Sequence, residues 1–381
     1  MKTLLPNLLL LSLLLATTSC SSTSVTNTTD QAVGPGKGPK NGKQFVIGWV
    51  PMDNPKNEIW KAFDDAMREI VEEAGFQLLF RSPQFDAVKQ NDRVLELITE
   101  DVDLIAVFPL NPISLISAIE QANQAGIPVA IFLNSVTDTA GVEVVFTVTS
   151  SDREAGRRAG EAMVDALTKK HGKPIGKVLE VQGKMTTTGA ILRGAGFHEV
   201  IDKYPEINVT SKSGEWDTGL ASRIIQDWMS VHTDTDGLYF HSDVNYMPAA
   251  QAALSAIDRW APLGDPRHVI ITAEDGSNLA VHAIRYGYME YTSDFGIADL
   301  GPMMANLCVK YLQTGELPKI GQKRPRPDGA GEDAEVVQQE GKEGPIVLIP
   351  VSPITQDNAD DPSLFANKHQ APPNGLSPLA W

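Results

Sequence analysis

Cysteine is scarce in this chain of 381 residues, which contains only Cys20 and Cys308. Two cysteines cannot form a disulfide framework or a structural zinc site. The seven histidines show no HxxxH spacing, and the GxSxG and Walker A patterns are missing as well. The sequence therefore gives no sign of a metal centre, an activated serine or a nucleotide loop, and we expect neither an enzyme nor a bound cofactor.

Basic residues are also few, because 32 Lys and Arg stand against 48 Asp and Glu, for a net charge of −16. This excess repels phosphate backbones, so nucleic acid is not expected as a partner. The composition, 42% hydrophobic and 21% charged, is that of a globular protein. Since single cores stop growing at about 250–300 residues, the length predicts two domains.

The N-terminus, residues 1–20, reads as a secretory signal. Lys2 provides a positive charge, and residues 4–16 are leucine-rich but too short to span a bilayer. Cys20 at the expected cleavage point resembles a bacterial lipoprotein signal, in which this thiol carries a lipid anchor to the membrane. Thr17 stands where that signal usually has leucine, so an ordinary signal peptide with an incidental cysteine is the alternative.

Residues 21–43 are rich first in Ser and Thr and then in Gly, Pro and Lys. Such a composition cannot bury apolar surface, and it predicts a flexible tether. The GPGKGPK run within it follows no strand and opens no helix, so it is not a phosphate-binding loop.

From residue 45 onward, apolar runs of strand length alternate with segments of helical periodicity. Phe45 to Val50 is a continuous apolar run, typical of a strand buried on both faces. Helix 57–74 follows, with apolar residues at helical spacing and Gly75 at its end. The alternation runs to about residue 133 and starts again near 153, which predicts an α/β fold of two doubly wound lobes with parallel sheets. Two such lobes direct the carboxyl ends of their strands toward a shared crevice.

Several local segments together resemble the periplasmic sugar-binding proteins of the ribose and glucose/galactose type, the type I solute-binding components of ABC importers. The resemblance covers about residues 45–358. The segments that carry it are Gln90-Asn91-Asp92, residues 121–129, Arg193-Gly194-Ala195-Gly196-Phe197, Glu215-Trp216-Asp217-Thr218, Asp227-Trp228, Ile349-Pro350-Val351 and Thr355-Gln356-Asp357-Asn358.

This resemblance implies three hinge crossovers between the lobes and closure around a ligand. The N-terminal lobe would comprise residues 44–150 and 296–320. The C-terminal lobe would comprise residues 151–295 and 345–358, with 345–351 as its last strand. Residues 321–344 are expected to form a loop, and residues 359–381 an irregular tail.

Two tryptophans match the family's stacking aromatics. A sugar offers apolar C–H faces, and the resemblance implies that Trp60 of one lobe and Trp216 of the other enclose them. Trp216 lies between two acidic residues after a strand, which favours a loop. The alternative is that both indoles belong to the core, where aromatic side chains are common.

Polar ligand contacts are expected from residues that follow strands. Asp275 and Asp243 match family pocket positions, with helix capping as the alternative for each. Asn134 ends the fourth strand, and Asn57 and Asp53 occupy the first loop, where the family also binds. At the third strand Phe108 replaces a polar residue, and near the second hinge either Asp294 or Phe295 would contact the ligand.

Three departures from the family pattern bear on the kind of ligand. Ile191 stands where the family commonly has a ligand-binding arginine, Phe108 stands where ribose-type members often have a polar residue, and Glu274 replaces an apolar or aromatic residue. Arg193 is assigned a structural role. A pocket rich in carboxylates and aromatics disfavours an acidic ligand. We therefore expect a neutral sugar or polyol, with a cationic small molecule in an aromatic cage as the alternative.

The resemblance implies an extracytoplasmic receptor, expected to be a monomer, that delivers its ligand to an ABC permease. A sensory receptor for a membrane kinase or chemoreceptor is the second possibility, since both use ligand-driven closure. Cys308 falls on the apolar face of the last helix and is expected to be an inert core thiol.

Overall fold

A computed structural model of the protein describes residues 38–40, 42–52, 58–134, 142–327, 332–338 and 344–368. The expected signal peptide with Cys20, most of the tether, Asp53, Asn57 and the tail beyond residue 368 lie outside these ranges. None of the helices in these ranges has the length and apolar character that crossing a bilayer requires.

The N-terminal lobe is built on an eight-stranded sheet with the order β11-β12-β13-β5-β4-β3-β1-β2. Its strands are β1 (Val46–Val50), β2 (Gln77–Phe80), β3 (Leu104–Val107), β4 (Val129–Phe132), β5 (Phe146–Ser150), β11 (Lys323–Arg324), β12 (Ala334–Val337) and β13 (Ile346–Ile349). All pairings from β13 to β2 are parallel, whereas β12 is antiparallel to both of its neighbours.

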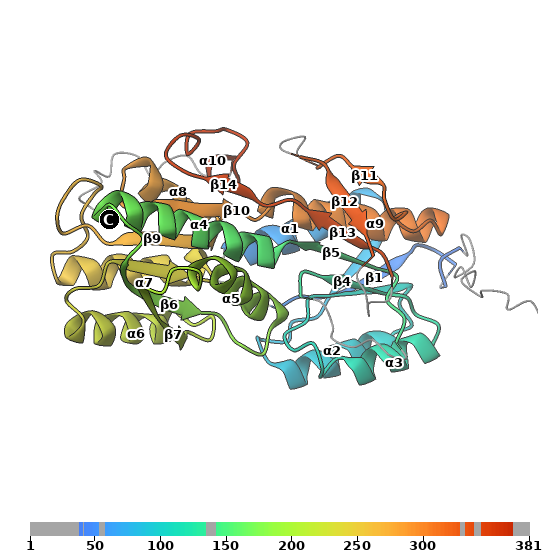
Figure 1. The fold of residues 1–381 in the computed structure, drawn as a ribbon. Coiled ribbons are helices and arrows are strands. Elements are labelled where there is room, and N and C mark those ends of the chain that lie inside the picture. The colour runs from blue at the N-terminus through green and yellow to red at the C-terminus, as the bar shows by residue number, and fades with distance from the viewer. Residues whose placement is uncertain are drawn as a thin grey trace, which may run out of the picture.

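Helices cover both faces of this sheet (Figure 1). Helices α1 (Glu58–Glu73) and α9 (Ile297–Thr314) share one apolar core with it, and α2 (Ala87–Thr99) and α3 (Ile116–Gln124) share another. Strand β1 is buried along its whole length, as its continuous apolar run predicts. Cys308 of α9 is a free, fully buried thiol with a raised pKa caused mainly by burial, which agrees with an inert core residue.

The C-terminal lobe has a six-stranded sheet with the order β14-β10-β9-β8-β6-β7. Its strands are β6 (Gly176–Gln182), β7 (Ile207–Ser213), β8 (Gly237–Phe240), β9 (Ile270–Asp275), β10 (Tyr291–Asp294) and β14 (Ser352–Ile354). Helices α4 (Asp152–His171) and α5 (Thr188–Ile201) share one core with this sheet. Helices α6 (Thr218–Val231), α7 (Asp243–Ala256) and α8 (Asn278–Arg285) share the other.

The chain crosses between the lobes three times, as the family resemblance implies. The crossings lie between β5 and α4, between β10 and α9, and between β13 and β14. The first and third crossings are tied together, because the Ser150 hydroxyl donates a hydrogen bond of 2.9 Å to the Ile349 carbonyl oxygen. At the second crossing Gly296 has φ 75°, and a Cβ there would come within 2.6 Å of Ile349, so this position requires glycine.

Two of the predicted boundaries are wrong. Residues 346–349 do not belong to the C-terminal lobe, because β13 pairs in parallel with β5 in the N-terminal sheet. Strand β5 was not recognised in the sequence, so the edge that β13 occupies was not foreseen. Only β14 returns to the second lobe, where it runs antiparallel to β10. The expected loop at 321–344 contains β11 and β12, which extend the N-terminal sheet.

The expected irregular tail is ordered at its start. Leu364, Phe365 and Ala366 are buried, and the short helix α10 (Phe365–Lys368) packs near α8. Arg285 of α8 holds this segment by donating to the Asn367 side chain at 2.8 Å. The C-terminal lobe therefore extends beyond residue 358.

Candidate functional site

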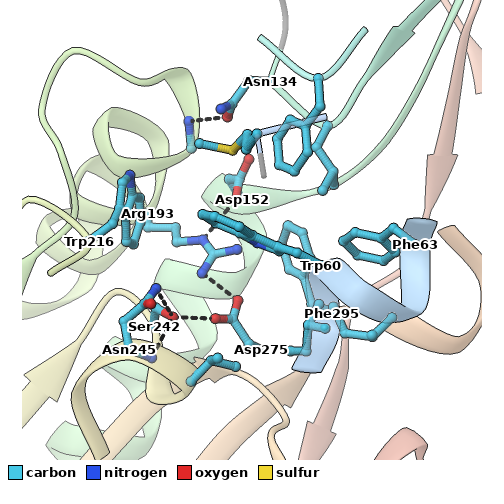
Figure 2. A pocket seen from close by; sticks show the side chains of 17 residues that line it. Trp60, Phe63, Asn134, Asp152, Arg193, Trp216, Ser242, Asn245, Asp275 and Phe295 are labelled. Atoms are coloured by element: carbon cyan, nitrogen blue, oxygen red, sulfur yellow. Dashed lines mark hydrogen bonds and ion pairs between the residues drawn. The ribbon is translucent and has the colours of Figure 1, made fainter. Parts of the chain in front are cut away.

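A cavity lies between the lobes, where the carboxyl ends of the strands of both sheets meet (Figure 2). It encloses about 600 Å³ of space, part of it open to solvent, which lies within the usual range for small-molecule sites. The lining residues are Met52, Ile59, Trp60, Phe63, Phe108, Leu133, Asn134, Asp152, Gly189, Arg193, Trp216, Ser242, Val244, Asn245, Asp275, Phe295 and Ile297.

Both tryptophans expected to stack on the ligand line this one cavity. Each is partly buried rather than enclosed in the core of its own lobe. Trp60 comes from the first turn of α1, and its indole is stacked on Phe85 with ring centroids 5.6 Å apart. Phe108, which follows β3, meets Trp60 edge-on at 6.3 Å. These neighbours fix the orientation of Trp60 at the cavity.

Trp216 is held by its backbone and by neighbours in the C-terminal lobe. It has a left-handed backbone with φ 59°, its N–H donates to the Tyr246 hydroxyl at 2.9 Å, and its indole N–H donates to Thr187 Oγ1 at 3.3 Å. A Cβ on Gly183 would lie 2.1 Å from the indole ring. The indole of Trp216 therefore fits in this position because Gly183 has no side chain.

The substitution Gly183→Ala should displace Trp216 and weaken ligand binding about tenfold, which corresponds to about 1.4 kcal/mol. The added methyl group meets a ring at the cavity surface, so the indole can move without disturbing the core. Isothermal titration should show the weaker binding while the thermal midpoint of the unliganded protein stays nearly unchanged. Unaltered affinity would contradict this role of Gly183.

Arg193 of α5 is the centre of the polar wall. Its Nε donates to Asp152 Oδ1 at 2.8 Å, and its Nη1 donates to Asp275 Oδ1 at 2.7 Å and to the backbone oxygen of His241. Its guanidinium also lies 4.4 Å from the Phe295 ring centroid. The sequence assigned Arg193 a structural role, which its ion-paired network fits, and the structure also places its side chain at the cavity surface.

Burial and ion pairing compete in setting the charge of this wall. Burial alone would lower the pKa of Arg193, but Asp275 and Asp152 outweigh it and raise the pKa, so the guanidinium is always charged. Burial raises the pKa of Asp152, while Arg193 opposes that shift. The wall thus combines one fixed cation with carboxylates.

Ser242 and Asn245 complete the polar wall from the start of α7. The Ser242 hydroxyl donates to Asp275 Oδ2 at 2.5 Å, and Asn245 Nδ2 donates to Ser242 Oγ at 3.0 Å. Asp275 has φ 107°, an unfavourable backbone conformation for a residue with a Cβ. Such strain is typical of functional positions, and here it places the carboxylate between Ser242 and Arg193.

Asp243 does not line the cavity, so its prediction as a ligand contact is corrected. It is fully buried and accepts hydrogen bonds from the backbone N–H groups of Gly276 and Ser277 and from the Thr292 hydroxyl. Burial raises its pKa to about 7. Helix α7 begins at Asp243, with Ser242 as its N-cap. This start of the helix places Asp243 in the buried interior and Ser242 and Asn245 at the cavity.

Glu274 also lies behind the cavity rather than in it. It is fully buried, where it accepts hydrogen bonds from the hydroxyls of Tyr239, at 3.2 Å, and Ser293. Burial raises its pKa to about 8, although Arg193 opposes this shift. The acidic side chains that line the cavity are therefore Asp152 and Asp275, and not Glu274.

Some of the remaining predicted contacts line the cavity and others do not. Asn134 lines the cavity, where its Nδ2 donates to the Pro109 oxygen at 2.9 Å and its Oδ1 accepts the Gly189 N–H of the opposite lobe at 3.4 Å. Phe295 lines the cavity, whereas Asp294 does not; Asp294 accepts the Gly296 N–H and lies 3.5 Å from Arg326. Within the described residues, no cluster of His, Cys, Asp or Glu could hold a metal ion.

Two α/β lobes with a cavity between the carboxyl ends of their strands define a two-lobed small-molecule-binding protein. The comparison with protein families makes this specific, because residues 47–317 match the periplasmic binding protein domain family. The chain belongs to this family, whose members bind solutes outside the cytoplasm.

Curated relatives and solved structures agree with this assignment. A ribose import binding protein of Bacillus subtilis is 26% identical over 64% of this chain and 74% of its own length. A xylitol-binding protein of Mycolicibacterium smegmatis is 28% identical over 74% of this chain and 70% of its own. A solute-binding protein of Actinobacillus succinogenes with bound D-allose has the same fold, with a TM-score of 0.68 and 17% identity over 84% of this chain and 100% of its own.

Proposed function

We propose that this protein captures a small neutral sugar or polyol between its lobes and delivers it to the permease of an ABC importer. One observation carries the proposal: Trp60 and Trp216 line the same cavity as the Asp152–Arg193–Asp275 network. Indole faces suit the C–H faces of a sugar, and charged groups form strong hydrogen bonds with its hydroxyls. The ribose, apiose and xylitol binding proteins among its relatives support this class of ligand.

The charge of the cavity supports a neutral ligand over a cationic or an acidic one. A cation would lie beside the guanidinium of Arg193 and would have to compete with it for Asp152 and Asp275. An acidic ligand would have to compete with those same carboxylates for the guanidinium. A neutral hydroxyl can donate to a carboxylate and accept from the guanidinium without disturbing the network.

The same proposal covers location and assembly. We propose that the mature chain acts as a monomer outside the cytoplasm, held at a membrane by a lipid on Cys20, and that it catalyses no reaction. Mass spectrometry of the protein purified from a bacterial membrane fraction tests the anchor. A mature N-terminus other than residue 20, or an unmodified Cys20, would contradict it.

A thermal-shift screen of neutral sugars and polyols tests the function. A ligand at about 100-fold excess over its dissociation constant should stabilise the protein by about 2.7 kcal/mol. Sugar acids and small amines form the comparison sets and should give no shift. Stabilisation by amines alone would favour a cation receptor, and product formation from any sugar would contradict a purely binding function.

A further inference from the structure

The turn that carries Trp216 to the cavity has an unusual backbone. Glu215 has φ 54° and Trp216 has φ 59°, so two successive residues with a Cβ lie in the left-handed region. Each such residue costs conformational energy and persists only where its surroundings hold it. Because this turn joins β7 to α6 beside the cavity, the contact that holds it also fixes the place of the indole.

The hydroxyl of Tyr246 in α7 holds this turn. It accepts a hydrogen bond from the Trp216 N–H at 2.9 Å and donates one to the Gln182 carbonyl oxygen, also at 2.9 Å. Gln182 ends β6, and its carbonyl oxygen also accepts the Gly214 N–H at 2.8 Å. A single hydroxyl therefore ties the backbone of Trp216 to the end of the neighbouring strand.

Tyr246 is firmly packed in the C-terminal lobe. It is fully buried, and its ring lies nearly parallel to the indole of Trp216, with centroids 6.4 Å apart and an angle of 12° between the planes. A Cβ on Gly214 would come within 2.8 Å of the Tyr246 hydroxyl, so glycine at this position leaves room for it. Burial raises the pKa of Tyr246, so the hydroxyl keeps the proton that it donates to Gln182.

The same helix also supplies part of the polar wall. Ser242, the N-cap of α7, and Asn245 line the cavity, whereas their neighbour Tyr246 lies outside the lining. The start of α7 thus supports the polar wall directly and the stacking tryptophan through Tyr246.

We infer that Tyr246 is a positioning residue of the binding site: its hydroxyl holds the left-handed turn at residues 215–216 and thereby keeps the indole of Trp216 at the cavity. The place of the indole is a property of the unliganded protein, whereas the consequence for binding rests on the proposed function. The two can therefore be measured separately.

The place of the indole is tested by fluorescence of the unliganded full chain. Tyr246→Phe removes the hydroxyl and keeps the buried ring. In each protein, the emission of Trp216 is the difference from the same protein with Trp216→Phe added. In Tyr246→Phe this emission should shift to longer wavelength and be quenched more strongly by acrylamide, because the released indole meets more water. A merely structural role of Tyr246 would not produce a change confined to this one tryptophan.

The consequence for binding is tested by calorimetry. Tyr246→Phe should bind a neutral sugar or polyol about fivefold to tenfold more weakly, because hydrogen bonds that fix a contact residue are lost. D-ribose and xylitol are the first probes, followed by the sugar with the largest thermal shift. Gly214→Ala disturbs the same contact from the other side, since its methyl group would displace the hydroxyl. It should change emission and affinity in the same direction.

Tyr291→Phe is the matched control. Tyr291 is a buried tyrosine of the same lobe, and its hydroxyl has no hydrogen-bond partner among the described residues. This variant should leave both the emission of Trp216 and the affinity unchanged.

The outcomes separate the inference from the proposed function. Changed emission with weaker binding in Tyr246→Phe and Gly214→Ala, and neither in Tyr291→Phe, supports the inference. Unchanged emission in both variants overturns it, whatever the protein binds. Changed emission with unchanged affinity also overturns it, because the place of the indole would then not matter for binding. If no neutral sugar or polyol binds the native protein, the proposed function fails, while the emission still decides whether Tyr246 holds the indole.

Discussion

Replacing Arg193 with methionine should lower the free energy of unfolding by about 3–5 kcal/mol and abolish ligand binding. Arg193 is 7% exposed, and removal of its guanidinium leaves Asp152 and Asp275 without their cation in a buried site. Two uncompensated carboxylates in such a place must remain charged at high cost or take up protons. Urea denaturation at pH 7 measures the loss of stability.

The matched control is Arg153→Met, the same substitution in the neighbouring helix α4. Arg153 pairs with Glu199, but these side chains are 58% and 38% exposed, so the loss should stay below about 1 kcal/mol. Equal effects of the two substitutions would mean that the buried network contributes no more than a surface ion pair.

The loss of stability in Arg193→Met should depend on pH in a definite direction. Burial already raises the pKa of Asp152 in the presence of Arg193, and removing the cation should raise it further. A carboxyl whose pKa is higher in the folded protein than in the unfolded chain favours folding at low pH, and that contribution is lost as the pH rises. The difference in the free energy of unfolding between Arg193→Met and the native protein should therefore shrink as the pH falls from 7 toward 4.

The lobes were predictable because their strands are buried on both faces. Continuous apolar runs such as Val46–Val50 indicate such strands, and the helices between them show a clear period. Strands β5 and β10 were missed because their sequences, FTVTS and YTSD, contain polar residues and therefore form no continuous apolar run. Because β13 pairs with β5, missing β5 in the sequence also placed β13 in the wrong lobe.

The lining of the cavity was predicted in outline from the family resemblance. Residues that the family resemblance supplied, such as Trp60, Trp216 and Asp275, line the cavity. Asp243 was predicted at the cavity, but it lies in the first turn of α7 with its side chain buried, while its neighbour Ser242 lines the cavity. The ion-pair network of Arg193 could not be predicted, because no local pattern shows that carboxylates from α4 and β9 meet it across the fold.

The indole pair should dominate ligand affinity. In Trp60→Ala and in Trp216→Ala, ligand binding should weaken at least about 30-fold, as expected for aromatic side chains at the centre of a closed site. Both indoles are partly exposed to the cavity, so their removal should leave the unliganded fold intact. The measurement is the thermal shift at a fixed ligand concentration, which should largely disappear in each variant.

A third tryptophan provides the control. Trp228 of α6 is partly buried, stacks near His232 and donates to Thr235 Oγ1 at 2.8 Å, away from the cavity. Trp228→Ala should lower the stability of the protein yet keep the full ligand-induced shift. Trp60→Phe should recover part of the binding, since a ring still faces the sugar. Full thermal shifts in both Trp60→Ala and Trp216→Ala would show that the ligand does not lie between the indoles, because a ring held there would lose a stacking face in each variant.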